Sequence, residues 1–138
     1  MYTYDSHIIP GKSFPLGATV FPHGVNFSVY AKYATSVELL LFDDIDDTKP
    51  SRCIRLDPKR DRTFHYWHVF IQGLKEGQVY AYRVYGPSSP SEGHRFDGAK
   101  VLIDPYAHAV AFPEKYDPVA ACRPGDNCIH AAKAVVVD

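Results

Sequence analysis

The stretch Val25–Ala31, with the sequence VNFSVYA, alternates in polarity and decides the class of fold. Its odd-numbered residues are all apolar, whereas Asn26 and Ser28 between them are polar. Successive side chains of a strand point to opposite faces, so this alternation is typical of a β-strand with one buried face. The stretch therefore predicts a strand that covers a hydrophobic core.

A second alternating stretch follows after a short break at Tyr33–Ala34. Val37, Leu39 and Leu41 fall on one face of the strand that this stretch predicts. Two such strands close together in the chain are most simply paired with each other. We therefore predict a hairpin that joins residues 25–31 to residues 35–42.

Further short strands are predicted along the middle of the chain, at Arg52–Leu56, Tyr66–Gln72 and Gln78–Tyr85. The glycines of Gly73–Gly77 suit a hairpin loop between the last two of them. Prolines and glycines interrupt every candidate amphipathic helix before residue 100. Many short strands separated by turn residues predict an all-β fold, an antiparallel β-sandwich.

The last third of the chain has a different texture. Residues 87–93, PSSPSEG, are expected to form an exposed loop, and the region beyond residue 107 is rich in proline. Only Ala134–Val137 has the composition of a strand there, and it ends without a following element, as in a chain cut from a longer one. We therefore predict a sandwich domain over residues 1–110 and an irregular C-terminal tail or linker over residues 111–138.

Composition excludes several classes of partner. The 138 residues carry a formal net charge of -1, so the chain lacks the broad positive field that binding of nucleic acid needs. No apolar run approaches the length that spans a membrane, and the N-terminus does not resemble a secretory signal. Three cysteines cannot all pair within one chain, which favours reduced thiols in a cytoplasmic protein.

Motifs for metal binding and catalysis are missing from the sequence. The acidic run Asp43–Asp47 lacks the glycine and the glutamate that close a calcium loop, so a solvated turn is expected there. His65 and His68 would point to opposite faces of one strand and could not share a metal. No nucleophile elbow or phosphate loop is present. We expect no metal, no cofactor and no catalytic residue in this chain.

Aromatic residues offer a candidate binding surface. An exposed aromatic ring can stack on the apolar face of a sugar while nearby polar groups bind its hydroxyls. The strand-borne candidates for such a carbohydrate site are Trp67, Tyr80, Tyr82 and Tyr85, with Tyr80 and Tyr82 on one face and Tyr85 on the other. The alternative is that these rings belong to the core, since tyrosine and tryptophan are favoured in strands.

Four segments resemble, in order and spacing, the N-terminal part of isoamylase-type glycogen debranching enzymes of glycoside hydrolase family 13. These segments are SFPLGATVFPHGVNFSVYAKYATSVELLLFD, WHVFIQGLKEGQVYAYRVYGP, GHRFDGAKVLIDPYAHAV and KAVVVD. The resemblance implies an immunoglobulin-like β-sandwich, a family 48 carbohydrate-binding module. In that family a (β/α) barrel follows and hydrolyses the α-1,6 branch linkages of glycogen or limit dextrin. A barrel needs roughly 250 residues, so this chain is expected to have no enzyme activity by itself.

The resemblance also assigns a role to the motif GHRFDGAKVLIDPYA, residues 93–107, which leads from the sandwich toward the barrel. It implies domain docking by Arg95, Phe96, Asp104 and Tyr106, with Asp104 capping the turn at Pro105 and residues 101–103 forming a short strand. The partners implied are the catalytic barrel in cis and α-glucan, bound weakly or indirectly. A free-standing glucan-binding protein and a protein-interaction module of the same fold remain alternatives.

Overall fold

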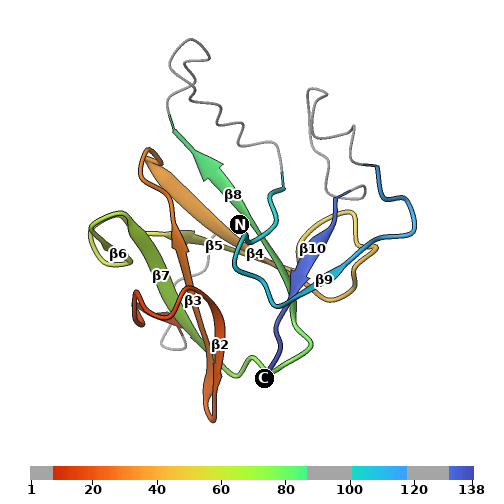
Figure 1. Cartoon of the computed structure of the whole chain (residues 1–138), viewed down its shortest axis with the longest axis horizontal. Coiled ribbons are helices and arrows are strands. Elements are labelled where there is room, and N and C mark those ends of the chain that lie inside the picture. Colours follow the sequence, from red (N-terminus) through yellow and green to blue (C-terminus); the bar gives the residue numbers. More distant parts are fainter. Residues whose placement is uncertain (1–7, 87–100, 118–130) are drawn as a thin grey trace.

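The computed structural model describes residues 8–86, 101–117 and 131–138 of the chain. Two antiparallel sheets stack face to face in a β-sandwich (Figure 1). The first sheet has the strand order β1 (Ile8–Ile9), β7 (Tyr66–Gln72), β3 (Gly24–Tyr30), β2 (Gly17–Phe21), and β6 (Arg62–Thr63) also pairs with β7. The second sheet has the order β5 (Arg52–Leu56), β4 (Ser36–Phe42), β8 (Val79–Tyr85), β10 (Lys133–Val135), β9 (Ala109–Ala111). The predicted antiparallel sandwich is confirmed.

The inward faces of the two sheets build the main core. The apolar positions of the opening stretch, Val25, Phe27 and Val29, are all buried there, as the alternation predicts. They meet Leu39 and Leu41 of β4, which come from the opposite sheet. The alternating pattern therefore identified the core-facing side correctly, but the expectation of a single buried face is wrong, because Asn26 and Ser28 on the other side of β3 are 2% and 0% exposed.

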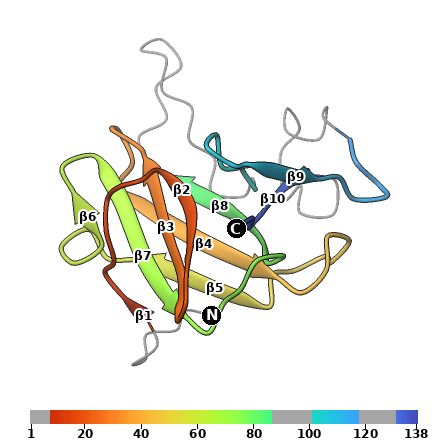
Figure 2. The same ribbon diagram turned by 60° about the horizontal axis from the view of Figure 1, so that its bottom comes forward.

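The two predicted hairpins are wrong. β3 pairs with β2 and β7, whereas β4 pairs with β5 and β8, so the chain crosses from one sheet to the other after Tyr30. It crosses again between β7 and β8 over residues 73–78, as the separation of these strands in Figure 2 shows. Alternation reports which face of a strand is buried, and two strands on opposite sides of one core have the same pattern. The true hairpin of the opening stretch is formed with β2, through Pro22 and His23.

The outer face of the second sheet carries a smaller apolar cluster. Leu40, Phe42 and Ala81 point away from the main core and pack against Val101 and Ala131. Residues 101–103 form only an isolated bridge, in which Leu102 exchanges both backbone hydrogen bonds with Tyr82 at 2.8 and 2.9 Å. The chain therefore covers the apolar part of this face with its own later segments.

Residues 133–135 form a strand within the second sheet. Ala134 pairs with Tyr80 on one side and with Val110 on the other. The predicted exposed loop at 87–93 and residues 118–130 of the predicted tail lie outside the described residues. The boundary at residue 110 stays a prediction.

Candidate functional site

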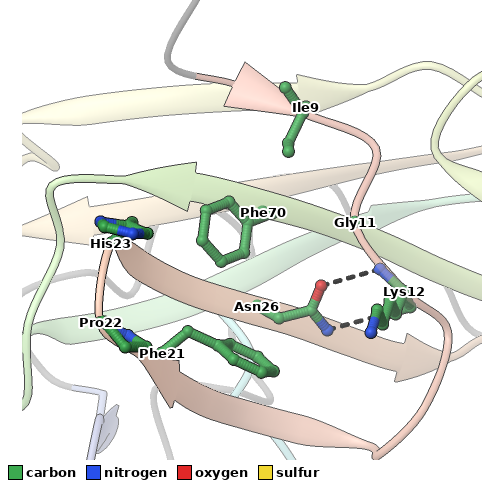
Figure 3. Close-up of a pocket in the computed structure, with 8 residues that line it drawn as sticks. All are labelled: Ile9, Gly11, Lys12, Phe21, Pro22, His23, Asn26 and Phe70. Carbon is green, nitrogen blue, oxygen red and sulfur yellow. Dashed lines mark hydrogen bonds between the residues drawn. The ribbon is translucent and has the colours of Figure 1, made fainter.

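An open pocket of about 450 Å³ lies on the outer face of the first sheet (Figure 3). Asn26 and Phe70 reach it because they alternate with core residues along β3 and β7. The lining is mainly apolar and consists of Ile9, Gly11, Lys12, Phe21, Pro22, His23, Asn26 and Phe70. Such a surface suits apolar side chains or rings.

Asn26 fastens the segment around Lys12 across this outer face. Its Oδ1 accepts a hydrogen bond from the backbone N–H of Lys12 at 2.8 Å, and its Nδ2 donates to the carbonyl of Lys12 at 2.9 Å. Gly11 adopts φ +71°, and a Cβ there would collide with Asn26 Oδ1 and lie 2.9 Å from the backbone nitrogen of Phe70. The amide thus shapes one wall of the pocket (Figure 3).

Exposed apolar side chains form the rest of the pocket. The rings of Phe21 and Phe70 lie 6.0 Å apart between centroids and are inclined at 57°. Phe21 is 38% exposed and Ile9 is 42% exposed, although both belong to strands. The sequence prediction missed this site. Its signal was the phenylalanine at position 70, which the period of two places opposite the core residues Val69 and Ile71.

The predicted cap at Asp104 is confirmed. Asp104 Oδ1 accepts the backbone N–H of Tyr106 at 2.9 Å, and Oδ2 accepts the hydroxyl of Tyr80 at 2.6 Å. Asp104 is buried, and burial raises the pKa of its carboxyl, while the bonds from Tyr80 and Tyr106 oppose that rise. Burial, followed by the nearby Asp104 charge, also raises the pKa of Tyr80.

The other predicted docking residues differ in position. Tyr106 is 38% exposed, and its carbonyl lies against buried Gly17 at the start of β2, where an added Cβ would come within 2.9 Å. Arg95 and Phe96 lie outside the described residues. Because Asp104 points inward, it orients Tyr106 and offers no free carboxylate to a partner.

Most of the predicted carbohydrate candidates lie in the core. Trp67, Tyr80 and Tyr82 are 0%, 1% and 3% exposed, so their ring faces pack against protein and cannot form a surface platform for a sugar. Tyr85 is half-buried on the other face of β8, and its hydroxyl donates to Glu38 Oε1 at 2.6 Å. Trp67, Tyr80 and Tyr82 are therefore core residues, which is the alternative that the sequence left open. Strand propensity explains why they resemble binding residues in the sequence.

Cys53 is a free thiol beside the buried carboxylate of Glu38, with Sγ 3.5 Å from Oε2. Burial, followed by the negative charge of Glu38, raises the pKa of Cys53 to about 11. At pH 8 the thiolate should therefore be roughly a hundredfold rarer in the folded chain than for an ordinary cysteine.

Alkylation rates test this prediction for Cys53. In a Cys122→Ser/Cys128→Ser variant, iodoacetamide should modify Cys53 roughly a hundredfold more slowly in the folded state than in urea at pH 8, as followed by mass spectrometry. The rate in the folded state should rise as the pH approaches 11. Equal rates with and without urea would contradict the described environment.

Within residues 8–86, 101–117 and 131–138, no three or more metal-binding side chains gather into a potential site. No helix in the same ranges has the length and hydropathy to cross a membrane. The acidic run closes a turn, since the backbone N–H of Asp44 bonds to the carboxylate of Asp47 at 3.0 Å and the N–H of Asp47 to the carbonyl of Asp44 at 3.1 Å.

Solved structures share this fold. A pullulanase from Paenibacillus barengoltzii, in complex with maltohexaose and α-cyclodextrin, matches with a TM-score of 0.60 and 20% identity, covering 99% of this chain and 16% of that chain. A Klebsiella pneumoniae pullulanase complexed with maltotriose matches with a TM-score of 0.61 and 22% identity, covering 91% of this chain and 10% of that chain. At these identities the likeness concerns the fold.

Sequence relatives are closer. Isoamylase 1, chloroplastic, of Arabidopsis thaliana is 41% identical over 123 residues, which cover 88% of this chain and 15% of the relative. A glycogen debranching enzyme of Serratia proteamaculans is 44% identical over 113 residues, which cover 82% of this chain and 16% of the relative. The chain thus spans about a sixth of the length of these relatives. The family profile described as carbohydrate-binding module 48 (isoamylase N-terminal domain) matches residues 15–107, and the chain belongs to that family.

Proposed function

We propose that this chain works as the N-terminal module of a glycogen debranching enzyme, packs on its catalytic domain and supports binding of α-glucan. The observation that carries this proposal is the match of residues 15–107 to the isoamylase N-terminal domain. Relatives that are about six times longer support it, because they have room for a catalytic barrel beyond the matched segment.

Hydrolysis of the α-1,6 linkages belongs, in this proposal, to the barrel, and the isolated chain has no activity. Release of reducing sugar from limit dextrin by the purified 138-residue chain would contradict this statement. We also propose a cytoplasmic location, supported by the free thiol of Cys53.

We propose the pocket beside β2 as the main docking surface for the catalytic domain. Three observations support this choice: Ile9 and Phe21 are exposed there, the pocket is apolar, and the apolar part of the outer face of the second sheet is covered by the chain itself. Tyr106, which is 38% exposed, lies beside Gly17 at the opposite end of β2 and stays a candidate for a second contact. The predicted contributions of Arg95 and Phe96 remain part of the proposal.

A difference in thermal stability tests the docking surface. The reading frame that contains this chain is expressed in full, and Phe21→Ser is made both there and in the 138-residue chain. We expect the Tm of the module to fall by several degrees in the full protein and to change by no more than about 2 °C in the isolated chain, because only the full protein has the interface.

Phe112→Ser is the matched control, since Phe112 is 61% exposed and lies outside the pocket. It should have little effect in either protein. Equal effects of Phe21→Ser in both proteins would place the docking surface elsewhere. A reading frame without a catalytic domain would overturn the proposed function itself.

A further inference from the structure

Phe64 occupies an unusual position at the tip of the β6–β7 hairpin. Thr63 pairs with Tyr66, so Phe64 and His65 alone form the loop. Phe64 has φ +59°, a left-handed conformation that favours glycine, and its side chain is 72% exposed. Both features reduce stability, and a large apolar ring on a strained backbone points to a binding role.

Three neighbouring rings join Phe64 in what we call the aromatic cluster, made of Tyr30, Phe64, His65 and Tyr66. The centroids of the Phe64 and His65 rings are 3.8 Å apart, and those of Tyr30 and His65 are 5.9 Å apart. Tyr30, which is 41% exposed, contacts Tyr66 edge to face at 5.3 Å. The cluster thus presents connected ring surfaces, with phenol hydroxyls and an imidazole among them.

Hydrogen bonds hold the hairpin that carries the cluster. The carbonyl of His65 accepts the backbone N–H of Ala31 at 2.9 Å, which ties the loop to the end of β3. The carbonyl of Phe64 accepts Arg62 Nε at 2.8 Å, and Thr63 Oγ1 lies 2.8 Å from a ring nitrogen of His68. A surface held in this way loses little conformational entropy on binding.

We propose that the aromatic cluster is a binding platform for α-glucan, in which the ring of Phe64 stacks on the apolar face of a glucose unit. Sugar is favoured over protein because the cluster combines exposed ring faces with the hydroxyls of Tyr30 and Tyr66, the combination that suits a pyranose ring and its hydroxyls. It lies at a hairpin tip, whereas the apolar pocket near β2 is concave. The choice of an α-glucan rests on the proposed function.

Titration of the 138-residue chain with maltoheptaose, followed by amide chemical shifts, tests the proposal. We expect shifts at residues 30–33 and 62–66 at millimolar sugar. Phe64→Gly should weaken binding at least about tenfold, because a stacking ring is lost. Its Tm should not fall, because glycine relieves the left-handed backbone. A structural role for Phe64 predicts the opposite change in Tm.

Phe112→Gly serves as the control, since it removes an exposed ring that packs against Tyr116 away from the hairpin. It should leave sugar binding unchanged. The platform is rejected if maltoheptaose causes no shifts, if the shifts gather around Phe21 and Phe70, or if Phe64→Gly binds as well as the wild type. It is also rejected if the catalytic domain of the parent protein, and not sugar, binds the β6–β7 hairpin. Absence of shifts, or normal binding by Phe64→Gly, would leave the docking test with Phe21→Ser and the proposed function standing, so the platform can fail without them.

Discussion

Trp67→Ala is expected to lower the free energy of unfolding by about 3–5 kcal/mol. The side chain of Trp67 is 0% exposed within the main core, and its Nε1 donates to the carbonyl of Ala31 at 3.2 Å. The Arg62 guanidinium lies over its ring at 5.1 Å from the centroid. Alanine would leave a cavity between the sheets and an unpaired carbonyl. The free energy of unfolding of a whole domain is only about 5–15 kcal/mol, so this loss is a large part of it.

Urea denaturation followed by far-ultraviolet circular dichroism measures this loss, since Trp67 is the chain's only tryptophan and its fluorescence disappears in the variant. Trp67→Phe keeps a ring and should lose about half as much or less. Phe112→Ala, at an exposed position, should stay within about 0.5 kcal/mol of the wild type. If Trp67→Ala kept full stability and lost only sugar binding, Trp67 would be a binding residue after all.

Asp104→Ala is expected to lower the free energy of unfolding by about 2–4 kcal/mol. The substitution removes the acceptor of both the Tyr80 hydroxyl and the Tyr106 N–H, and Tyr80 is only 1% exposed. A buried donor without a partner keeps its full desolvation cost. Asp104→Asn retains a carbonyl oxygen of the same shape and should lose less. Equal losses in the two variants would show that the hydrogen bonds contribute little.

The difference in unfolding free energy between the wild type and Asp104→Asn is expected to decrease as the pH rises. Burial raises the pKa of Asp104 above its usual value of 3.8, so the folded chain binds this proton more tightly than the unfolded chain. The contribution of Asp104 is therefore fully present below the unfolded pKa and declines as the pH rises through the folded pKa. Urea denaturation should show a larger advantage of wild type over Asp104→Asn at pH 3 than at pH 7. An advantage that grows with pH would contradict the raised pKa.

The candidate surfaces could be predicted only in part. The cap at Asp104 was predictable because an Asp-Pro turn is a local motif. The exposure of aromatic rings could not be predicted from the sequence. Trp67 and Phe64 are only three residues apart and have similar neighbours in the sequence, yet Trp67 is 0% exposed and Phe64 is 72% exposed. Exposure depends on which side of the sheet is later covered. The pocket likewise brings Ile9, Phe21 and Phe70 together from three strands.

The amino-acid sequence by itself determined the positions of β3, β4, β5, β7 and β8, the core-facing sides of β3 and β4, and the family of this protein, but it did not indicate β2. Strand β5 and strand β7 have the predicted bounds, because alternation of polarity is a property of neighbouring residues. The tertiary structure alone decided which strands pair, since β3 bonds to β7 some forty residues away while its neighbour in sequence, β4, lies in the other sheet. Pairing depends on backbone groups and apolar faces that many strands have in common, and only packing around one core selects among them.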